Sequence, residues 1–481
     1  MKILLLQPPE NMEKILGNGK HFAKPLPPSG IMYIGSYLEK KGYNVKIIDA
    51  YFYGYDVNKT VAAILNEGPS ILGISCLTSN GANVYAIVRA IKKIAPKIKI
   101  VLGNIHASVF SSFYIKNAGA DFVIHNEGEE TLKNLLDLIG KNKTIFSEIK
   151  DLSWKKGKEA VNNKKNDKTL SLDEIPWPAR HLVPFIKYTD GKYKKVKNKN
   201  VDVLFSSRGC VNKCTFCCIG SREKYRYREP IDVVDEMSYV HNKYGINIFE
   251  FGDPLFTFNK QRIIKICEEI LRRNMKISWE CEGHAKFITE DMLMAMKAAG
   301  CTGVYYGIES GTPRILKEIR KNASKNDIEK AIKNTNKMGI RPSGLFMLGF
   351  PGETEEEMFE TMKFSVDLPL ESAQFAITTP YPGTSLYYEL INKNEIKLKD
   401  EDDPGFVEDW YRYSAYSSYT DVEPIWLPMG ITSKRLKQIQ KIALRNFYFR
   451  PTKVYSQIKK IKFSSVSHVV SLAKAIKDSF L

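Results

Sequence analysis

Half of the eight cysteines in this 481-residue chain lie within positions 210–218. Three of them, Cys210, Cys214 and Cys217, have the spacing Cys-x3-Cys-x2-Cys, which supplies three soft thiolates from one loop. Three thiolates can hold three irons of a 4Fe–4S cubane and leave the fourth iron open to a substrate or cofactor. The alternatives are a redox pair, a chance grouping or a zinc knuckle, but structural zinc sites usually pair two Cys-x2-Cys units. The motif therefore predicts an iron–sulfur cluster.

The four other cysteines, Cys76, Cys267, Cys281 and Cys301, occur singly in apolar stretches and are predicted to be core residues. This pattern is typical of a reducing compartment, where clustered cysteines serve metal binding or catalysis instead of disulfides. The sequence has no apolar run of eighteen residues, and its N-terminal apolar run is too short for a signal peptide. We therefore expect a cytoplasmic protein.

Short apolar strands alternate with amphipathic helical patterns over residues 1–140. This alternation predicts an α/β domain with a doubly wound parallel sheet that is covered by helices on both faces. Ligands of such sheets bind beyond the carboxyl ends of the strands. Six candidate ligand contacts are expected there: Ser75, Thr78, Gly103, His106, Glu127 and Gly128.

The remaining chain divides into three parts by composition. Residues 141–200 are polar, lysine-rich and interrupted by prolines, which predicts a linker. Residues 201–400 contain six further strand–helix units, which predict a partial or full parallel (β/α) barrel with its active face at the carboxyl ends of the strands. Residues 401–481 form a C-terminal region whose last part is basic and helical, and we expect it to cap the barrel.

An aromatic residue, Phe216, stands directly before the third cysteine of the motif, and glycine-containing turns follow the later strands at 249–254, 307–311, 350–354 and 380–384. In order and spacing this set resembles the radical S-adenosylmethionine (SAM) superfamily. Taken singly, Gly352 could serve only as a turn and Glu309 only as an ion-pair partner. The resemblance implies that SAM binds at the cluster, in contact with Phe216, Gly252, Asp253, Glu280, Glu282, Glu309 and Ser310.

The resemblance also implies a type of chemistry. Members of the superfamily cleave SAM reductively into methionine and a 5′-deoxyadenosyl radical, and this radical abstracts hydrogen from an unactivated carbon. The electron comes from a separate reductant of the flavodoxin or ferredoxin type. In such enzymes the protein positions the substrate and excludes side reactions, while the cofactor carries the demanding chemistry.

Segments 27–34, 101–107 and 126–131 resemble the cobalamin-binding subgroup of this superfamily, and residues 445–451 resemble its branch of anaerobic magnesium-protoporphyrin ester cyclases and hopanoid or lipid C-methylases. This implies cobalamin as a further cofactor and carbon methylation as the reaction. One departure is that Asp-x-His-x-x-Gly, whose histidine ligates cobalt in many cobalamin proteins, does not occur; His106 follows the fourth strand and lacks the aspartate. A cobalamin-free enzyme that catalyses cyclisation, radical coupling or oxidation is therefore the alternative.

Lysine and arginine exceed the acidic residues by 18. Residues 431–481 contain twelve basic residues and one acid, and residues 187–199 contain six lysines and one acid. In the C-terminal stretch the basic residues interleave with aromatic and aliphatic side chains, a composition typical of an interfacial helix on anionic lipid. We therefore expect peripheral contact with the inner membrane face and a small-molecule substrate that is hydrophobic or lipid-like. A cap whose lysines only face water is the alternative.

Two other classes of protein would also contain a cysteine cluster. A tRNA methylthiotransferase would use the positive charge to bind RNA, but members of that class hold a second cluster through three N-terminal cysteines, and residues 1–140 contain only Cys76. A non-enzymatic iron–sulfur protein would leave the turns at Glu309 and Gly352 without a role. We therefore expect an enzyme that does not bind nucleic acid.

Overall fold

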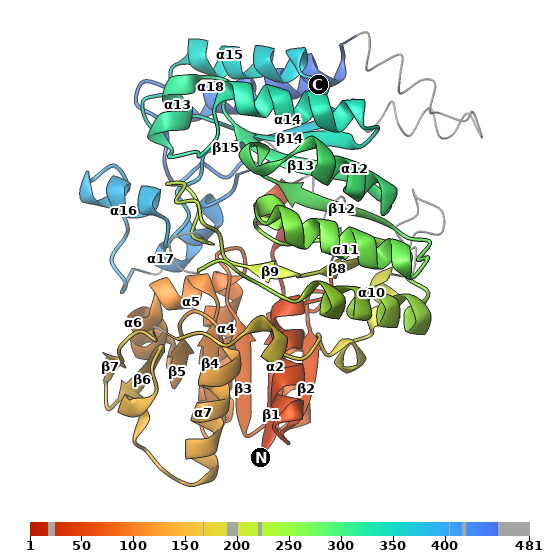
Figure 1. The fold of residues 1–481 in the computed structure, drawn as a ribbon. Coiled ribbons are helices and arrows are strands. Elements are labelled where there is room, and N and C mark those ends of the chain that lie inside the picture. The colour runs from red at the N-terminus through yellow and green to blue at the C-terminus, as the bar shows by residue number, and fades with distance from the viewer. Residues whose placement is uncertain are drawn as a thin grey trace, which may run out of the picture.

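The computed structural model describes residues 1–17, 25–166, 168–189, 201–219, 224–403, 405–415 and 420–450. Two large sheets dominate the fold, the N-terminal one at the bottom of Figure 1 and the second one above it. The short strand β9 (Ser207–Arg208), which leads into the cysteine loop, lies between them (Figure 1).

The first sheet has seven strands in the order β2-β1-β3-β4-β5-β6-β7, and its first five strands are parallel. This confirms the predicted parallel sheet of the first domain. The bounds of the parallel strands are β1 (Lys2–Gln7), β2 (Asn44–Asp49), β3 (Ile71–Ser75), β4 (Lys99–Gly103) and β5 (Phe122–Ile124).

Helices cover both faces of this sheet, as expected of a doubly wound fold. Alternate residues of β1 point to opposite faces, so that Ile3 packs in the core under α2 and α7 while Leu4 packs in the core under α3 and α4. Both strand faces are apolar because both are buried. The helix bounds are α2 (Ser29–Lys40), α3 (Val57–Glu67), α4 (Gly81–Ile94) and α7 (Glu129–Gly140).

An antiparallel hairpin extends the first sheet beyond residue 140. β6 (Leu152–Lys156) pairs with β5, and β7 (Glu159–Asn162) pairs with β6 across a turn at Gly157, whose φ of 63° favours glycine. Both strands lie within residues 141–200, for which the sequence predicted a linker. The hairpin was not predicted, because lysines and other polar residues are typical both of a sheet edge and of a linker.

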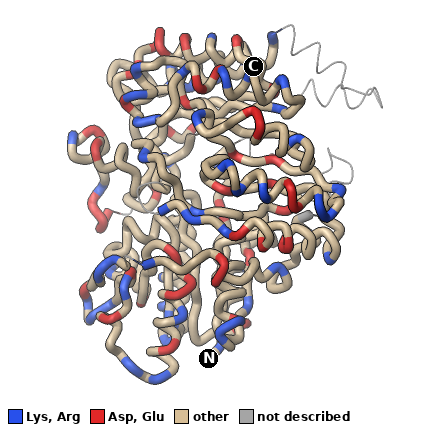
Figure 2. The backbone as a smooth tube through the Cα atoms, in the orientation of Figure 1, with Lys and Arg blue, Asp and Glu red and all other residues tan. Residues whose placement is uncertain are grey.

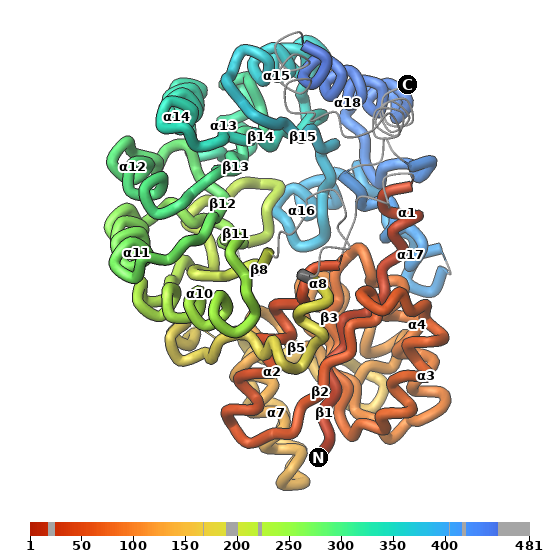
Figure 3. The backbone as a smooth tube through the Cα atoms, turned by 90° about the vertical axis from the view of Figure 1, so that its right-hand side faces the viewer, coloured from red at the N-terminus to blue at the C-terminus, as the bar shows by residue number. Residues whose placement is uncertain are grey.

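The second sheet contains six parallel strands in the order β15-β14-β13-β12-β11-β8. Among the described residues β8 and β15 do not pair, so the sheet forms an open, partial barrel. The strand bounds are β8 (Val201–Leu204), β11 (Ile248–Phe251), β12 (Ser278–Gly283), β13 (Cys301–Glu309), β14 (Arg341–Leu348) and β15 (Ser372–Ile377). Figure 3 shows the helices on its outer side: α10 (Pro230–Tyr244), α11 (Lys260–Arg272), α12 (Glu290–Ala298), α14 (Lys325–Lys337) and α15 (Glu355–Asp367).

The described end of the linker ties the two domains together. Arg180 is buried and forms ion pairs with Asp202 of β8 and Glu236 of α10, both at 2.7 Å. A few residues later, the Tyr188 hydroxyl donates to the carboxylate of Asp49 at the end of β2 (2.7 Å). The linker therefore holds the first domain against the barrel.

The C-terminal region contacts both sheets. α18 (Ser433–Tyr448) lies against β15, where the Tyr448 hydroxyl donates to the Ala373 carbonyl (2.9 Å). α16 (Ser385–Asn392) and α17 (Gly405–Glu408) instead contribute to the core of the first domain, and Figure 3 shows α17 beside that domain. The predicted helical cap is therefore present as α18, while the preceding helices join the domains.

Positively and negatively charged residues are mixed along the described part of the chain, as Figure 2 shows. No helix in this part is both long and apolar enough to cross a membrane. Most of the lysine-rich stretch 187–199 and all of residues 451–481, to which membrane contact was assigned, lie outside the described residues.

Candidate functional site

The three cysteines of the motif lie in the loop that follows β9, at the carboxyl end of the first barrel strand, β8. Cys210, Cys214 and Cys217 are all partly buried. Within the loop the Asn212 amide donates to the Cys210 sulfur (3.4 Å), and the Cys217 amide donates to the Cys214 carbonyl (3.1 Å). The loop's own hydrogen bonds therefore keep the three thiols on one compact turn.

Burial and charge around the thiols suit a metal-bound thiolate cluster. Burial raises the pKa of the Cys210 thiol and brings the pKa of the Cys214 thiol to about 11, while the nearby Lys321 ammonium favours both thiolates. Where the structure describes the chain, no three His, Cys, Asp or Glu side chains converge as they would around a single metal ion. Three soft thiols in one partly buried loop, with the Lys321 ammonium nearby, are a donor set that suits a 4Fe–4S cluster.

Two of the predicted SAM contacts border the cysteine loop. The Phe216 ring lies 5.8 Å from the ring of Phe350, which follows β14. Glu309 ends β13 with a φ of 67°, a left-handed conformation that costs energy for any residue other than glycine. Its carboxylate binds Lys321 (Nζ–Oε1 2.9 Å). Strained backbone of this kind is often found at ligand sites, which agrees with a role for Glu309 beside the cluster.

Two further predicted SAM contacts shape the start of the cysteine loop. The carboxylate of Asp253 is fully buried and accepts hydrogen bonds from the Ser206 amide (2.6 Å) and the Ser207 hydroxyl (2.7 Å). A Cβ at Gly252 would lie 2.8 Å from the ring of Phe205, so a side chain there would displace this ring. The Asp253 carboxylate therefore fixes the corner between β8 and β9, and SAM contact by these two residues stays a prediction.

The three other predicted SAM contacts differ in their surroundings. The buried hydroxyl of Ser310 lies 3.1 Å from a threonine hydroxyl of α15. The Glu280 carboxylate accepts from the Tyr305 hydroxyl (2.9 Å). Burial raises the pKa of Glu282, and neighbouring carboxylates, including that of Glu309, raise it further. Ser310 and Glu280 are thus bonded to other side chains, and SAM contact by all three residues stays a prediction.

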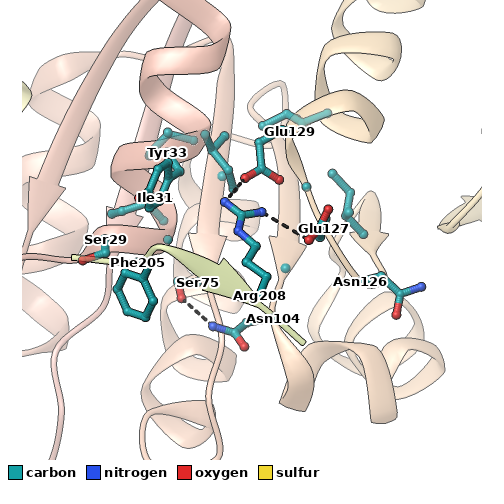
Figure 4. A pocket seen from close by; sticks show the side chains of 18 of the residues that line it. Ser29, Ile31, Tyr33, Ser75, Asn104, Asn126, Glu127, Glu129, Phe205 and Arg208 are labelled. Atoms are coloured by element: carbon teal, nitrogen blue, oxygen red, sulfur yellow. Dashed lines mark hydrogen bonds and ion pairs between the residues drawn. The ribbon is translucent and has the colours of Figure 1, made fainter. Parts of the chain in front are cut away.

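A cavity of 340 Å³ opens at the carboxyl ends of the first sheet, and both domains line it. Figure 4 shows Ser75, which ends β3, and Asn104, which follows the neighbouring strand β4, together with Arg208 from β9. Four of the six predicted cobalamin contacts are among the lining residues: Ser75, Gly103, Glu127 and Gly128.

Glycines keep this cavity open. A Cβ at Gly73 would meet Leu5 at 2.8 Å, and a Cβ at Gly128 would meet Ile34 at 3.1 Å. A Cβ at Gly103 would meet no atom within 4 Å, because this glycine faces empty space. The cavity has room for part of a corrinoid, and its lining of strand-end glycines, apolar side chains and a few polar groups fits such a ligand.

The two remaining predicted cobalamin contacts, Thr78 and His106, do not line this cavity. The His106 ring is fully buried between Phe110 and Trp410, at centroid distances of 4.7 and 4.3 Å. Its Nδ1 lies 3.2 Å from the Thr78 hydroxyl. Burial lowers the pKa of His106 to about 3, so the imidazole is neutral. Both residues therefore pack at the junction of the first domain and the C-terminal region.

The sequence analysis did not assign Arg208 to the cavity. Its guanidinium forms ion pairs with Glu129 (2.8 Å) and Glu127 (3.3 Å), as Figure 4 shows, and lies 5.1 Å from the centre of the Tyr33 ring. Arg208 also stands two residues before Cys210, so one residue connects the cavity with the cysteine loop. Its place beside the cysteine motif is the one signal in the sequence that could have indicated this role.

Known families match both domains of the chain. The Radical SAM superfamily model matches residues 204–365, and the B12 binding domain model matches residues 16–136. An uncharacterised methyltransferase of Pyrococcus horikoshii is 32% identical over 94% of this chain and 93% of its own length. Cytidylyl-2-hydroxyethylphosphonate methyltransferase of Streptomyces wedmorensis is 28% identical over 88% of this chain and 86% of its own.

A solved structure shares the arrangement of both domains. The radical SAM methyltransferase TsrM of Kitasatospora setae, determined with cobalamin and a 4Fe–4S cluster bound, has a TM-score of 0.70 over 94% of this chain and 89% of its own. At 17% identity this likeness concerns the fold. The two family models lie on the two predicted domains, and the Pyrococcus relative extends across both. The chain belongs to the radical SAM enzymes that carry a B12-binding domain.

Proposed function

We propose that this enzyme transfers a methyl group to an unactivated carbon, with a 4Fe–4S cluster, SAM and cobalamin as its cofactors. The observation that carries the proposal is the shared cavity, where Ser75 and Gly103 of the first sheet and Arg208 and Pro254 of the radical SAM domain line one space. A corrinoid held there would lie beside the segment that leads to the cluster. Methyltransferases among the relatives support the same reaction.

Different residues of the chain would bind the cluster and SAM. Cys210, Cys214 and Cys217 would hold three irons and leave the fourth to SAM. Glu309, at the end of β13, and Phe216, in the cysteine loop, would orient SAM. When bound, the cofactors supply the electron that cleaves SAM and the methyl group that is transferred. The protein keeps the cofactors close together and shields the radical from water.

We further propose a hydrophobic or lipid-like substrate, a reductant of the flavodoxin or ferredoxin type, and a cytoplasmic location with contact to the inner membrane face. The described part of the basic C-terminal region supports the contact. In α18 the apolar side faces the barrel, where Phe447 is fully buried, while Lys434, Lys441 and Arg445 are exposed. A basic outer face of this kind suits anionic lipid head groups.

The first test measures the cofactors on protein that is produced with hydroxocobalamin, purified without oxygen and reconstituted with iron and sulfide. We expect about one corrinoid and about four irons per chain, together with dithionite-dependent formation of 5′-deoxyadenosine. With SAM that carries a deuterated methyl group, the label should appear on carbon in a lipid extract treated with the enzyme. Four irons and SAM cleavage without corrinoid would contradict methyl transfer and leave coupling, cyclisation or oxidation as the reaction.

Two matched glycine variants test where the corrinoid binds. A Cβ at Gly103 or at Gly140 meets no atom within 4 Å, so a side chain can begin at either position without a clash at its first atom. Gly103→Leu fills the cavity, and we expect it to lose corrinoid while it keeps its iron and its SAM cleavage. Gly140→Leu, at the end of α7 and outside the cavity, should keep all three. Wild-type corrinoid content in Gly103→Leu would mean that the cofactor binds elsewhere.

A further inference from the structure

A short turn after α13 (Pro313–Glu318) fastens the cysteine loop from the side. The Thr215 amide donates to the Ile319 carbonyl (3.1 Å), and the Cys214 sulfur lies 3.8 Å from the Arg320 carbonyl oxygen. The side-chain amide of Asn322 also donates to the side-chain oxygen of Asn212 (3.2 Å), which again joins the turn to the loop. The residue in the middle of this turn is therefore held against the loop that carries the cluster.

That residue is Lys321, a buried cation. Its side chain is 8% exposed, and its Nζ lies 2.9 Å from Oε1 of Glu309, whose side chain is 9% exposed. Gly307 makes room for this pair, since a Cβ there would lie 3.0 Å from the lysine nitrogen and 2.6 Å from the glutamate oxygen. Burial by itself lowers the pKa of Lys321, but the Glu309 carboxylate and the nearby thiols outweigh this effect and raise it. Lys321 is therefore charged at neutral pH.

The charge of Lys321 acts on two cluster ligands as well as on Glu309. Lys321 directly follows Arg320, whose carbonyl oxygen lies 3.8 Å from the Cys214 sulfur, and its charge favours the thiolates of both Cys210 and Cys214. Charges interact more strongly in a buried site than in water, because the effective dielectric constant is lower. A fixed positive charge at this place therefore stabilises negative charge on an iron–sulfur cluster in the loop.

We propose that Lys321 raises the reduction potential of the cluster and that Glu309 opposes this effect. In the reduction step the external reductant loses one electron and the cluster gains it, so that the cluster becomes more negative by one charge without a proton transfer. The Lys321 ammonium stabilises the added charge, and the Glu309 carboxylate destabilises it. Net charge around the cluster is one of the factors that set such potentials. Lys321 is thus a positioning residue, which acts through the cluster.

The test measures the midpoint potential of the reconstituted cluster by redox titration with EPR detection, in the absence of SAM and cobalamin. We expect Lys321→Met to shift the potential to lower values and Lys321→Arg to stay near the wild type. Glu309→Gln should shift the potential to higher values, because it leaves the charge of Lys321 unopposed. Lys317→Met, which removes an exposed lysine from α13, is the matched control and should leave the potential unchanged.

A lysine with a purely structural role gives different results. Loss of packing would lower the iron content of Lys321→Met and Lys321→Arg alike, and it would not move the potentials of Lys321→Met and Glu309→Gln in opposite directions. Shifts of the same sign, no shift, or loss of the cluster from both lysine variants would each overturn the proposal. The proposal for Lys321 depends only on the cluster and does not depend on cobalamin. A negative result in the redox titration can therefore be told apart from a missing corrinoid in the methyl-transfer test.

Discussion

Glu353 follows β14 as a buried carboxylate, with 3% of its surface exposed. It accepts hydrogen bonds from the amides of Gly349 (2.6 Å) and Phe350 (2.9 Å). Burial raises the pKa of Glu353 from 4.5 to about 7. The folded chain therefore binds this proton more tightly than the unfolded chain does. The stability that the proton contributes is fully present below pH 4.5 and is lost as the pH rises toward about 7.

Glu353→Gln should remove this pH dependence, because an amide stays neutral. As the pH rises from 4.5 to about 7, the wild type should lose up to about 3 kcal/mol of unfolding free energy that the variant keeps. Thermal unfolding at several pH values in this range should show the Tm of the wild type falling relative to that of the variant. Glu356→Gln changes an exposed carboxylate of α15, the helix that follows Glu353, and should follow the wild type. Parallel curves for all three proteins would exclude Glu353 as the source.

Some residues of the site were predictable from the sequence because their partners are local. Three cysteines in one loop need no tertiary information to be assigned to one cluster. Lys321 and Arg208 bind carboxylates that are 12 and 79 residues away, and these pairs form only when the chain folds. His106 does follow the fourth strand as predicted, but its side chain points into a core that includes the distant C-terminal region. The direction of the His106 side chain therefore depends on packing against the C-terminal region, which local sequence does not predict.

α18 is the element that covers the edge strand β15 of the open barrel. Phe447 in this helix has no exposed surface, whereas Phe449, just after the helix, is 48% exposed. Phe447→Ala should lower the unfolding free energy by about 3–5 kcal/mol, because it leaves a cavity in the core. Phe449→Ala should change it by about 0.5 kcal/mol or less. Urea unfolding of the cluster-free protein measures both values, and equal losses would contradict the packing of α18 on the barrel.

The strands and helices of both sheets were predictable because their apolar residues repeat with the periods of buried elements. The hairpin of β6 and β7 was missed, since the lysines of an edge strand carry no such period. Residues 405–412 were assigned to the cap of the barrel but pack on the first domain, through Phe406 and Trp410. The local sequence predicts that a segment is apolar and leaves open which distant surface it will cover.

In the whole molecule, the carboxyl ends of both sheets meet at one cavity. Ser75 and Gly103 end strands of the first sheet, while Gly209 and Pro254 follow strands of the second part of the chain. Neither domain alone could bring a corrinoid next to SAM. Arg208 joins the two domains at this point, because it lines the cavity, pairs with Glu129 and leads into the cysteine loop, and Arg226 adds a second ion pair to Glu127.

Arg208→Met should therefore weaken both the fold and corrinoid binding. It leaves the carboxylate of Glu129, which is 5% exposed, without this guanidinium. Breaking a buried ion pair costs about 3–5 kcal/mol, and the partial exposure of Arg208 places the expected loss at the lower end of that range. Thermal unfolding of the cofactor-free protein and the corrinoid that remains after desalting measure the two effects.

The pair of Lys14 and Glu408 is a matched control, because it also joins the first domain to a distant part of the chain (2.6 Å) but has side chains that are 43% and 61% exposed. Lys14→Met should change the stability by about 1 kcal/mol or less and leave the corrinoid content unchanged. If Arg208→Met behaved like Lys14→Met in both measurements, the contact that couples the two domains would have to lie elsewhere, in the ion pair of Arg226 with Glu127, in the linker at Arg180 or under Trp410. If Arg208→Met lost corrinoid at unchanged stability, Arg208 would contact the cofactor without stabilising the contact between the two domains.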